Sequence, residues 1–217
     1  MRRTILSALA LTAIVSMSAM AQTIVGSKHD LSTGGGITNK STTQAQVCIF
    51  CHTPHQTTVT AKPLWNHTLS SVASYGVYSS TTLNATPTDI GGGTGVSNLC
   101  MSCHDGTVAV NNLGNGSATM GSGTELNTAG KLIVDTLGTS LTQDHPINFT
   151  YDATLATNDG GLKTPSSASY VDAAHNVPLY GATVQCASCH NPHNNTNGDF
   201  VRVSNSGSAL CLTCHNK

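Results

Sequence analysis

Hydrophobic residues are distributed unevenly along this 217-residue chain. One mostly apolar run occupies residues 5–15, and beyond it apolar residues occur in short groups between long polar stretches. Glycine, serine, threonine and asparagine dominate those stretches, and such runs predict loops. The clearest of these loops are residues 32–36, 89–95, 111–123 and 164–169.

Only short regular elements are predicted between these loops. Residues 131–137 and 200–203 are rich in β-branched and aromatic side chains and predict strands too short for a sheet-based fold. One helical turn is expected at each of four cysteine motifs described below. The predicted fold class is therefore mostly irregular backbone, with short helices at the motifs and a few short strands.

The apolar run near the amino end has the layout of a secretory signal peptide. Two arginines provide a charged start, the apolar run follows, and Ala19–Ala21 forms a small-residue cleavage site. A membrane anchor is the alternative, but the run is too short to span a bilayer. We therefore expect cleavage of residues 1–21, leaving residues 22–217 as a single exported domain without a membrane anchor.

Charge and composition narrow the possible partners. Without the two arginines of the predicted signal peptide, the nine basic residues fall to seven against ten acidic ones, a formal charge of −3. No basic stripe exists that would attract nucleic acid. Aromatic residues make up only 4% of the chain, so few large apolar side chains are available for a core. Either the chain is disordered, or something other than side chains fills its core.

All eight cysteines fall in four C-x-x-C-H motifs, the pattern of c-type haem attachment. The two thiols form thioethers with the haem vinyl groups, and the following histidine is the proximal ligand of the iron. The thioether cysteines are Cys48, Cys51, Cys100, Cys103, Cys186, Cys189, Cys211 and Cys214. The proximal histidines are His52, His104, His190 and His215.

Disulfides and zinc sites are the alternatives for paired cysteines in an exported protein. Neither requires a histidine directly after every second cysteine, yet all four motifs have one. We therefore predict four covalently bound haem c groups in one tetrahaem domain. Four large apolar cofactors would also supply the core that the side chains lack, so a haem-cored fold is expected.

Histidine is the expected second axial ligand of each iron. Methionine would raise the reduction potential, but only Met101 and Met120 lie beyond the predicted cleavage site, and Met101 lies inside its own motif. Six histidines are not proximal ligands, more than four distal positions require. They are His29, His55, His67, His145, His175 and His193.

The four motifs alternate between two types, which indicates a duplicated two-haem unit. The first and third read C-x-x-C-H-x-P-H, and the second and fourth read S-x-L-C-x-x-C-H. The two units cover about residues 48–104 and 186–215. His55 and His193 are therefore repeated features that would face away from their own iron, and each suits the iron of a neighbouring haem. A surface histidine is the alternative for both.

The other distal positions are assigned because few other ligands are available. His29 follows the predicted signal peptide, and His145 precedes Pro146, which holds the following backbone extended. An ordinary loop histidine is the alternative for each. The predicted distal ligands are His29, His55, His145 and His193, with His67 as the reserve candidate and His175 as a spare.

Several stretches resemble the doubled C-x-x-C-H cytochromes of metal-reducing bacteria, and most closely their filament-forming tetrahaem members. They are SKHDLS, CIFCHTPH, PLW, LCMSCHDGT, DHPINF, CASCHNPH and ALCLTCHNK. The resemblance implies closely stacked haems with two histidine ligands each, in a protein that polymerises into an extracellular wire. It also implies that one distal histidine comes from the adjacent subunit, and which of the four does so stays open.

Three functions are compatible with four such haems. The first is electron transfer as the subunit of an extracellular filament, in contact with other redox proteins or extracellular electron acceptors. The second is a monomeric periplasmic carrier with every ligand supplied by its own chain. The third is a multihaem nitrite or hydroxylamine reductase, but catalysis needs an open iron position with acid–base groups, and surplus histidines argue against one. We therefore expect an electron-transfer protein that is not an enzyme.

Overall fold

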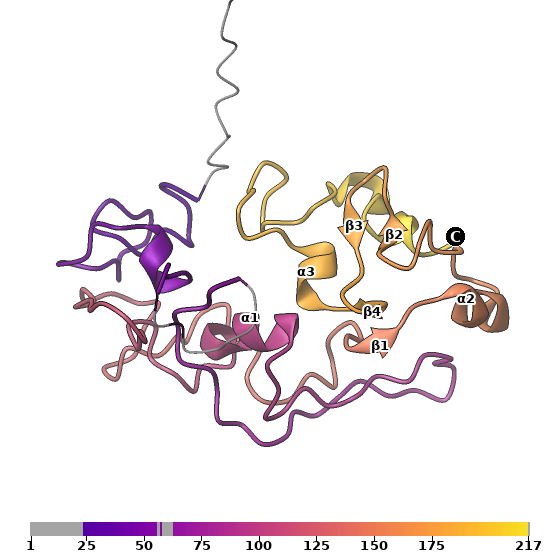
Figure 1. Ribbon diagram of the computed structural model, residues 1–217, viewed down its shortest axis with the longest axis horizontal. Coiled ribbons are helices and arrows are strands. Elements are labelled where there is room, and N and C mark those ends of the chain that lie inside the picture. Colours follow the sequence, from indigo (N-terminus) through magenta and orange to yellow (C-terminus); the bar gives the residue numbers. More distant parts are fainter. Residues whose placement is uncertain (1–23, 56, 58–62, 217) are drawn as a thin grey trace, which may run out of the picture.

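The computed structural model describes residues 24–55, 57 and 63–216. The predicted signal peptide lies outside these residues. Figure 1 shows an elongated molecule, with the amino-terminal part of the described chain at one end and the carboxy-terminal part at the other. Helices α1 (Val96–His104) and α3 (Cys186–Cys189) lie between these parts, near the middle of the long axis.

A short helical element covers all or part of each C-x-x-C-H motif. These elements are η1 (Cys48–Phe50), α1, α3 and η3 (Cys211–Thr213). In the first, third and fourth motifs, the histidine N–H donates to the carbonyl of the first cysteine at 2.7, 3.0 and 2.9 Å. Because this bond closes one helical turn, both cysteines and the histidine of a motif are carried on a single turn of backbone.

Helix α1 is held against the start of α3 by a buried polar contact. The hydroxyl of Ser97 donates to Oε1 of Gln185 at 2.5 Å and accepts from the N–H of Cys186 at 3.1 Å. Ser97 is fully buried, and Gln185 is 6% exposed. This contact joins the second and third motifs, which belong to different halves of the predicted duplication.

The strands are short and lie in the carboxy-terminal half of the chain. Strand β1 (Phe149–Thr150) pairs antiparallel with β4 (Thr183–Val184), with Phe149 opposite Val184. Strand β2 (Tyr170–Asp172) pairs antiparallel with β3 (Val177–Pro178), through an irregular register. Each pair is an isolated two-stranded ribbon, so no sheet organises the fold.

The strands predicted at residues 131–137 and 200–203 do not form. Both segments take part only in isolated bridges. The physical reason is a left-handed backbone turn within each segment, because φ is 56° at Asp135 and 56° at Phe200. A strand requires extended dihedral angles at every residue, so β-branched composition is overridden there.

Helix α2 (Ala153–Asp159) has no counterpart among the predicted elements. The Asp152 carboxylate caps it by accepting from the N–H of Leu155 at 2.8 Å, and Gly160 ends it with φ of 70°. These are ordinary start and stop residues of a helix, so the sequence did carry a signal. The remaining element is the short helix η2 (Ser206–Ser208). Among the described residues, no helix has the length and apolar character needed to cross a membrane.

Most of the buried hydrophobic side chains among the described residues belong to two small clusters. The larger contains Phe149, Tyr151, Leu155, Val171, Val177, Leu179 and Val184. The smaller contains Tyr75, Ile90, Met101 and Leu141. Elsewhere, buried polar side chains tie the loops together: Asn66, which is fully buried, donates to the carbonyls of Ile49 and Asn115 at 2.6 and 2.8 Å. Side chains alone therefore provide little apolar core for a chain of this length.

Candidate functional site

The four motifs neighbour one another in the order in which they occur along the chain. Burial raises the pKa of Cys103 to about 12, and the adjacent Cys51 adds to this rise. The neighbouring Cys186 raises the pKa of the Cys100 thiol well above its usual value, and burial adds to this rise. Burial raises the pKa of Cys189 to about 11, and the next contribution comes from the fourth motif. Each motif thus approaches the next through its cysteines.

Backbone carbonyls orient three of the proximal histidines. In each case Nδ1 of the imidazole lies within hydrogen-bonding distance of a carbonyl oxygen. The pairs are His52 with Pro63 at 2.7 Å, His104 with Asp135 at 2.9 Å and His190 with Asp199 at 2.9 Å. A carbonyl oxygen can only accept, so Nδ1 carries the proton and Nε2 keeps its lone pair for a metal.

These acceptor carbonyls are presented by left-handed turns of the backbone. Asp135 and Asp199 have φ of 56° and 45°, and Leu64, which follows Pro63, has φ of 65°. A bulky residue such as leucine rarely adopts this region, and backbone strain of this kind is concentrated at functional sites. The sequence did not indicate any of these three carbonyls, because every residue has one and residue identity carries no signal for its use.

Three proximal histidines each face a second histidine from a distant part of the chain. The ring centres are 6.1 Å apart for His29 and His104, 5.9 Å for His52 and His193, and 6.4 Å for His145 and His215. Each second histidine is one of the four predicted distal ligands. Three of the four are therefore brought opposite a proximal histidine.

The spacing of these pairs fits a metal ion held between the two rings. A metal–imidazole bond is about 2 Å long, and the ring centre lies roughly 1 Å behind the bonded nitrogen. Two imidazoles on opposite sides of one iron would therefore have centres roughly 6 Å apart. The observed range of 5.9–6.4 Å matches this value, so the donor set of thiols and imidazoles fits haem c.

His29 is partly buried, in a form that can bind a metal. Its ring stacks on Phe200, with centres 4.2 Å apart and planes 16° apart. Burial lowers the pKa of His29 to about 4, and the charge of His104 adds to this fall, while a hydrogen bond to the backbone of Pro192 opposes it. A neutral imidazole has a lone pair available for a metal, and packing fixes its direction.

His145 and His193 are prepared in similar ways. Nδ1 of His145 lies 2.9 Å from the carbonyl oxygen of Pro146, which leaves Nε2 without a proton, and the ring centre of His145 lies 6.4 Å from that of His215. Burial lowers the pKa of His193, and the charge of the facing His52 adds to this fall. The lowered pKa of His193 favours its neutral, metal-binding form.

His190 and His55 are not brought together. Within the described residues, no ring contact places a second histidine opposite His190. His55 is exposed, although its carbonyl is fixed by Thr53 Oγ1 at 2.8 Å and by Asn115 Nδ2 at 3.4 Å. In the part of the chain that the structure describes, the third motif is thus the one without a facing histidine.

The reserve candidate His67 is held by the backbone of its own chain. It is fully buried, with Nδ1 2.9 Å from the carbonyl oxygen of Thr68 and Nε2 2.9 Å from that of Ala109. Nε2 also lies 3.7 Å from Sγ of Cys103. Both ring nitrogens are near backbone acceptors, so the ring would have to leave these partners before it could bind an iron. This geometry favours a packing role beside the second motif.

Replacing His67 with phenylalanine is expected to destabilise the haem-loaded protein without changing its axial ligands. A neutral imidazole has one N–H, so either the carbonyl of Thr68 or that of Ala109 would lose its buried donor, and such a loss costs about 1–3 kcal/mol. Denaturant unfolding measures the stability, and the ferric absorption spectrum reports the ligands. The exposed His175→Phe variant is the control. A new high-spin component in the His67 variant alone would identify this residue as a ligand.

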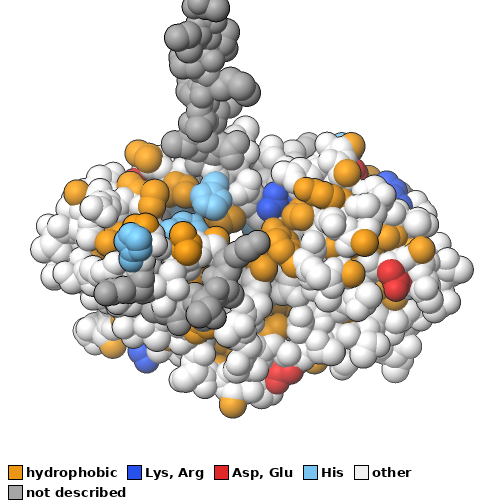
Figure 2. All heavy atoms as spheres, viewed as in Figure 1, with side chains coloured by type: hydrophobic (Ala, Val, Ile, Leu, Met, Phe, Trp, Pro, Cys, Tyr) orange, Lys and Arg blue, Asp and Glu red, His pale blue; other side chains and the backbone are white. Residues whose placement is uncertain are grey.

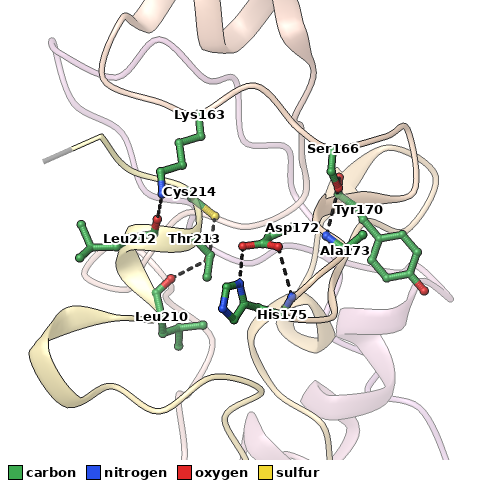
Figure 3. Close-up of polar contacts among 10 residues, drawn as sticks. All are labelled: Lys163, Ser166, Tyr170, Asp172, Ala173, His175, Leu210, Leu212, Thr213 and Cys214. Carbon is green, nitrogen blue, oxygen red and sulfur yellow. Dashed lines mark hydrogen bonds and ion pairs between the residues drawn. The ribbon is translucent and has the colours of Figure 1, made fainter.

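His175, the spare histidine, pairs with a carboxylate at the carboxy-terminal end of the molecule. Figure 3 shows that the Asp172 carboxylate accepts two hydrogen bonds from His175. Nδ1 of the His175 ring lies 2.6 Å from Oδ2, and the backbone N–H of His175 donates to Oδ1 at 3.2 Å. The side chain of His175 is 60% exposed. In the same view, Lys163 reaches the carbonyl of Leu212 beside the fourth motif. His175 faces no proximal histidine in this arrangement.

The thioether of Met101 is directed into the core. Met101 is fully buried in the cluster that contains Tyr75, Ile90 and Leu141. A side chain fixed among these residues cannot reach the far side of a haem attached to its own motif. The burial of Met101 therefore agrees with the preference for histidine ligands.

Apolar side chains are exposed beside the carbonyls that orient the histidines. Four large ones are Leu64, Ile133, Val134 and Leu137, which are 53%, 51%, 44% and 45% exposed. Leu64 follows Pro63, and the other three flank Asp135. Figure 2 shows histidines at the surface among hydrophobic side chains on part of the face that it draws. Exposed apolar groups next to metal donors suit a large apolar cofactor.

The comparison with protein families agrees with this chemistry. Residues 181–217 match the family described as the doubled CXXCH motif. No curated protein matches the chain. The matched segment holds the third and fourth motifs. It supports a multihaem protein of the c-type cytochrome kind, which binds haem c covalently through C-x-x-C-H and carries electrons.

Proposed function

We propose that this protein is a tetrahaem electron-transfer protein in which every iron has two histidine ligands. The observation that carries the proposal is the set of three histidine pairs with ring centres 5.9–6.4 Å apart. Each pair joins the histidine of a C-x-x-C-H motif to a histidine from outside that motif. Two strong ligands on each iron leave no position for a substrate, which favours a carrier over a nitrite or hydroxylamine reductase.

The contacts between motifs support a linear path for electrons. Haem c supplies a one-electron iron couple when it is bound. The chain's own contribution is to attach and orient the four groups in sequence, because the cysteines of each motif neighbour those of the next. We propose that electrons move from the first motif through the second and third to the fourth, or in reverse.

The histidine pairs follow the duplication of the chain. His29 precedes the first motif and faces His104 of the second, and His145 precedes the third motif and faces His215 of the fourth. In each two-haem unit, the histidine that precedes the first motif is therefore the distal ligand of the second iron. His193, the extra histidine of the second unit, instead faces the first motif, which belongs to the unit before it.

In the second unit, the extra histidine faces the first motif of the unit before it. If the same relation holds between neighbouring subunits, it gives His55 a function. His55 is the extra histidine of the first unit, so its target would be the third motif of the preceding subunit. The third motif is also the one without a facing histidine in the described residues. We therefore propose that His55 is the distal ligand that acts between subunits. A head-to-tail contact of this kind does not close on itself unless it forms a ring, and otherwise it produces an open filament.

The proposed setting is outside the cell. The predicted signal peptide supports export, and a filament of haems would deliver electrons to other redox proteins or to extracellular acceptors. A periplasmic carrier is the alternative, with the same four haems in a monomer. Both settings use the same chemistry and differ in whether subunits assemble.

Mass spectrometry, ferric absorption spectra and electron microscopy of the native protein test the proposal together. Four covalent haems, low-spin spectra without carbon monoxide binding, and filaments are the expected results. Four low-spin haems in a monomer would overturn the filament and support the periplasmic carrier. A native protein with a substantial high-spin fraction that binds carbon monoxide would overturn bis-histidine ligation and support an enzyme.

A further inference from the structure

One motif differs from the other three in the residue that follows its proximal histidine. His104 is followed by Asp105, whereas the corresponding residues in the other motifs are neutral. Those residues are Thr53, Asn191 and Asn216. The second motif is thus the only one with a carboxylate directly after its iron ligand. Neither haem attachment nor axial ligation, as described above, assigns a function to this charge.

Asp105 is buried and accepts hydrogen bonds from neutral donors. It is 4% exposed. Oδ2 accepts from the hydroxyl of Tyr75 at 2.6 Å, and Oδ1 accepts from the N–H and hydroxyl of Thr107 at 2.7 and 2.8 Å. Three donors directed at two oxygens favour the ionised carboxylate. Its charge therefore stays in the protein interior, one residue from His104.

The position of this charge is unfavourable for folding. Asp105 caps the carboxy-terminal end of α1, where the helix dipole is already negative and a second negative charge is destabilising. Burial of a carboxylate has a further cost, which its hydrogen bonds offset only in part. An asparagine could accept the same backbone bond from Thr107 and form the same turn. The turn alone therefore does not explain a charged residue here.

The other carboxylate near His104 is in a different state. Asp135 offers its backbone carbonyl to His104, while its side chain is 58% exposed and forms an ion pair with Lys28 at 3.0 Å. An exposed and paired charge is strongly screened by water and salt. Asp105 has no such screening, so its field acts more strongly within the buried region around the second motif.

We propose that Asp105 is a fixed negative charge that lowers the reduction potential of the haem bound to the second motif. The inference rests on the proposed function, because it requires a haem there. The ferric form of an iron carries one more positive charge than the ferrous form, so a nearby buried carboxylate stabilises the ferric form. The reduction potential along the four haems would therefore change sharply at the second motif, which lies beside the junction between the two halves of the molecule.

The test compares Asp105→Asn with Asp135→Asn in the haem-loaded protein. Asparagine keeps the size of each side chain and also tolerates the left-handed backbone at position 135. Spectroelectrochemical titration should show one of four components moving to higher potential in Asp105→Asn, and a smaller movement in Asp135→Asn. Unchanged components in Asp105→Asn, with four low-spin haems attached, would overturn the inference and leave the proposed function standing.

A second variant distinguishes the effect of the Asp105 charge from that of a general structural disturbance. Tyr75→Phe removes a neutral donor from Asp105 and leaves the carboxylate in place, so its negative charge is less compensated. The same component should then move to lower potential, opposite in direction to Asp105→Asn. Movement of both variants in one direction would indicate a structural disturbance and overturn the inference. Absence of haem from the second motif of the unmodified protein would instead overturn the proposed function itself.

Discussion

Replacing His55 with alanine is expected to abolish filament assembly and to leave one haem in four without a second histidine. The physical reason is that His55 is exposed and faces no proximal histidine among the described residues, whereas the third motif has no facing histidine there either. The other three histidine pairs do not involve His55, so their haems should stay low-spin. Electron microscopy measures assembly, and the high-spin fraction of the ferric spectrum measures the lost ligand.

The matched control is His175→Ala. His175 is also exposed, but it pairs with Asp172 and faces no proximal histidine. It should therefore change neither assembly nor spectrum. Added imidazole should restore the low-spin spectrum of His55→Ala without restoring filaments, because it replaces the ligand but not the link between subunits. Filaments of normal length from His55→Ala, with four low-spin haems, would show that the ligand between subunits is a different residue.

A chain prevented from binding haem is expected to lose cooperative folding altogether. The two hydrophobic clusters of the described residues are small, and one of them contains only four buried side chains. Ordering the backbone costs about 1–2 kcal/mol per residue, and so little apolar burial cannot offset that cost over a chain of this length. Replacing all eight cysteines with serine gives the haem-free chain without exposing it to denaturant.

Far-ultraviolet circular dichroism during heating, together with limited proteolysis, measures this loss. The haem-loaded protein is the control and should unfold in a cooperative transition at a temperature where the haem-free chain shows none. Rapid cleavage throughout the haem-free chain should accompany the absence of a transition. A cooperative transition in the serine variant would mean that side chains alone form the core, contrary to a haem-cored fold.

Local patterns in the sequence carried most of the attachment chemistry. Two thiols and an imidazole must lie on one helical turn to bind one haem, and the C-x-x-C-H spacing meets this requirement within five residues. The limit of such patterns is visible at α2, whose capping residues Asp152 and Gly160 were present but outweighed by the polar composition around them. It is also visible at Asp135, where a left-handed turn replaces the strand that composition predicted.

The pairing of distal histidines depended on tertiary structure. His193 faces His52 across most of the chain, and no local pattern records which distant loops will meet. The same holds for Pro63, Asp135 and Asp199, since their backbone carbonyls orient the proximal histidines whatever their side chains are. His67 could be separated from the other candidates only by the carbonyls that surround its ring.

The sequence by itself determined the chemistry of attachment: the eight cysteines, the four histidines that follow them, the alternation of two motif types and the surplus of further histidines. Only the tertiary structure decided which histidines face each other, that His190 faces none within the described residues, and that the charge of Asp105 is buried. The physical reason is how far apart along the chain the residues that form each feature lie. Covalent attachment is specified over a few neighbouring residues, whereas an axial pair or a buried charge exists only when packing brings remote segments together.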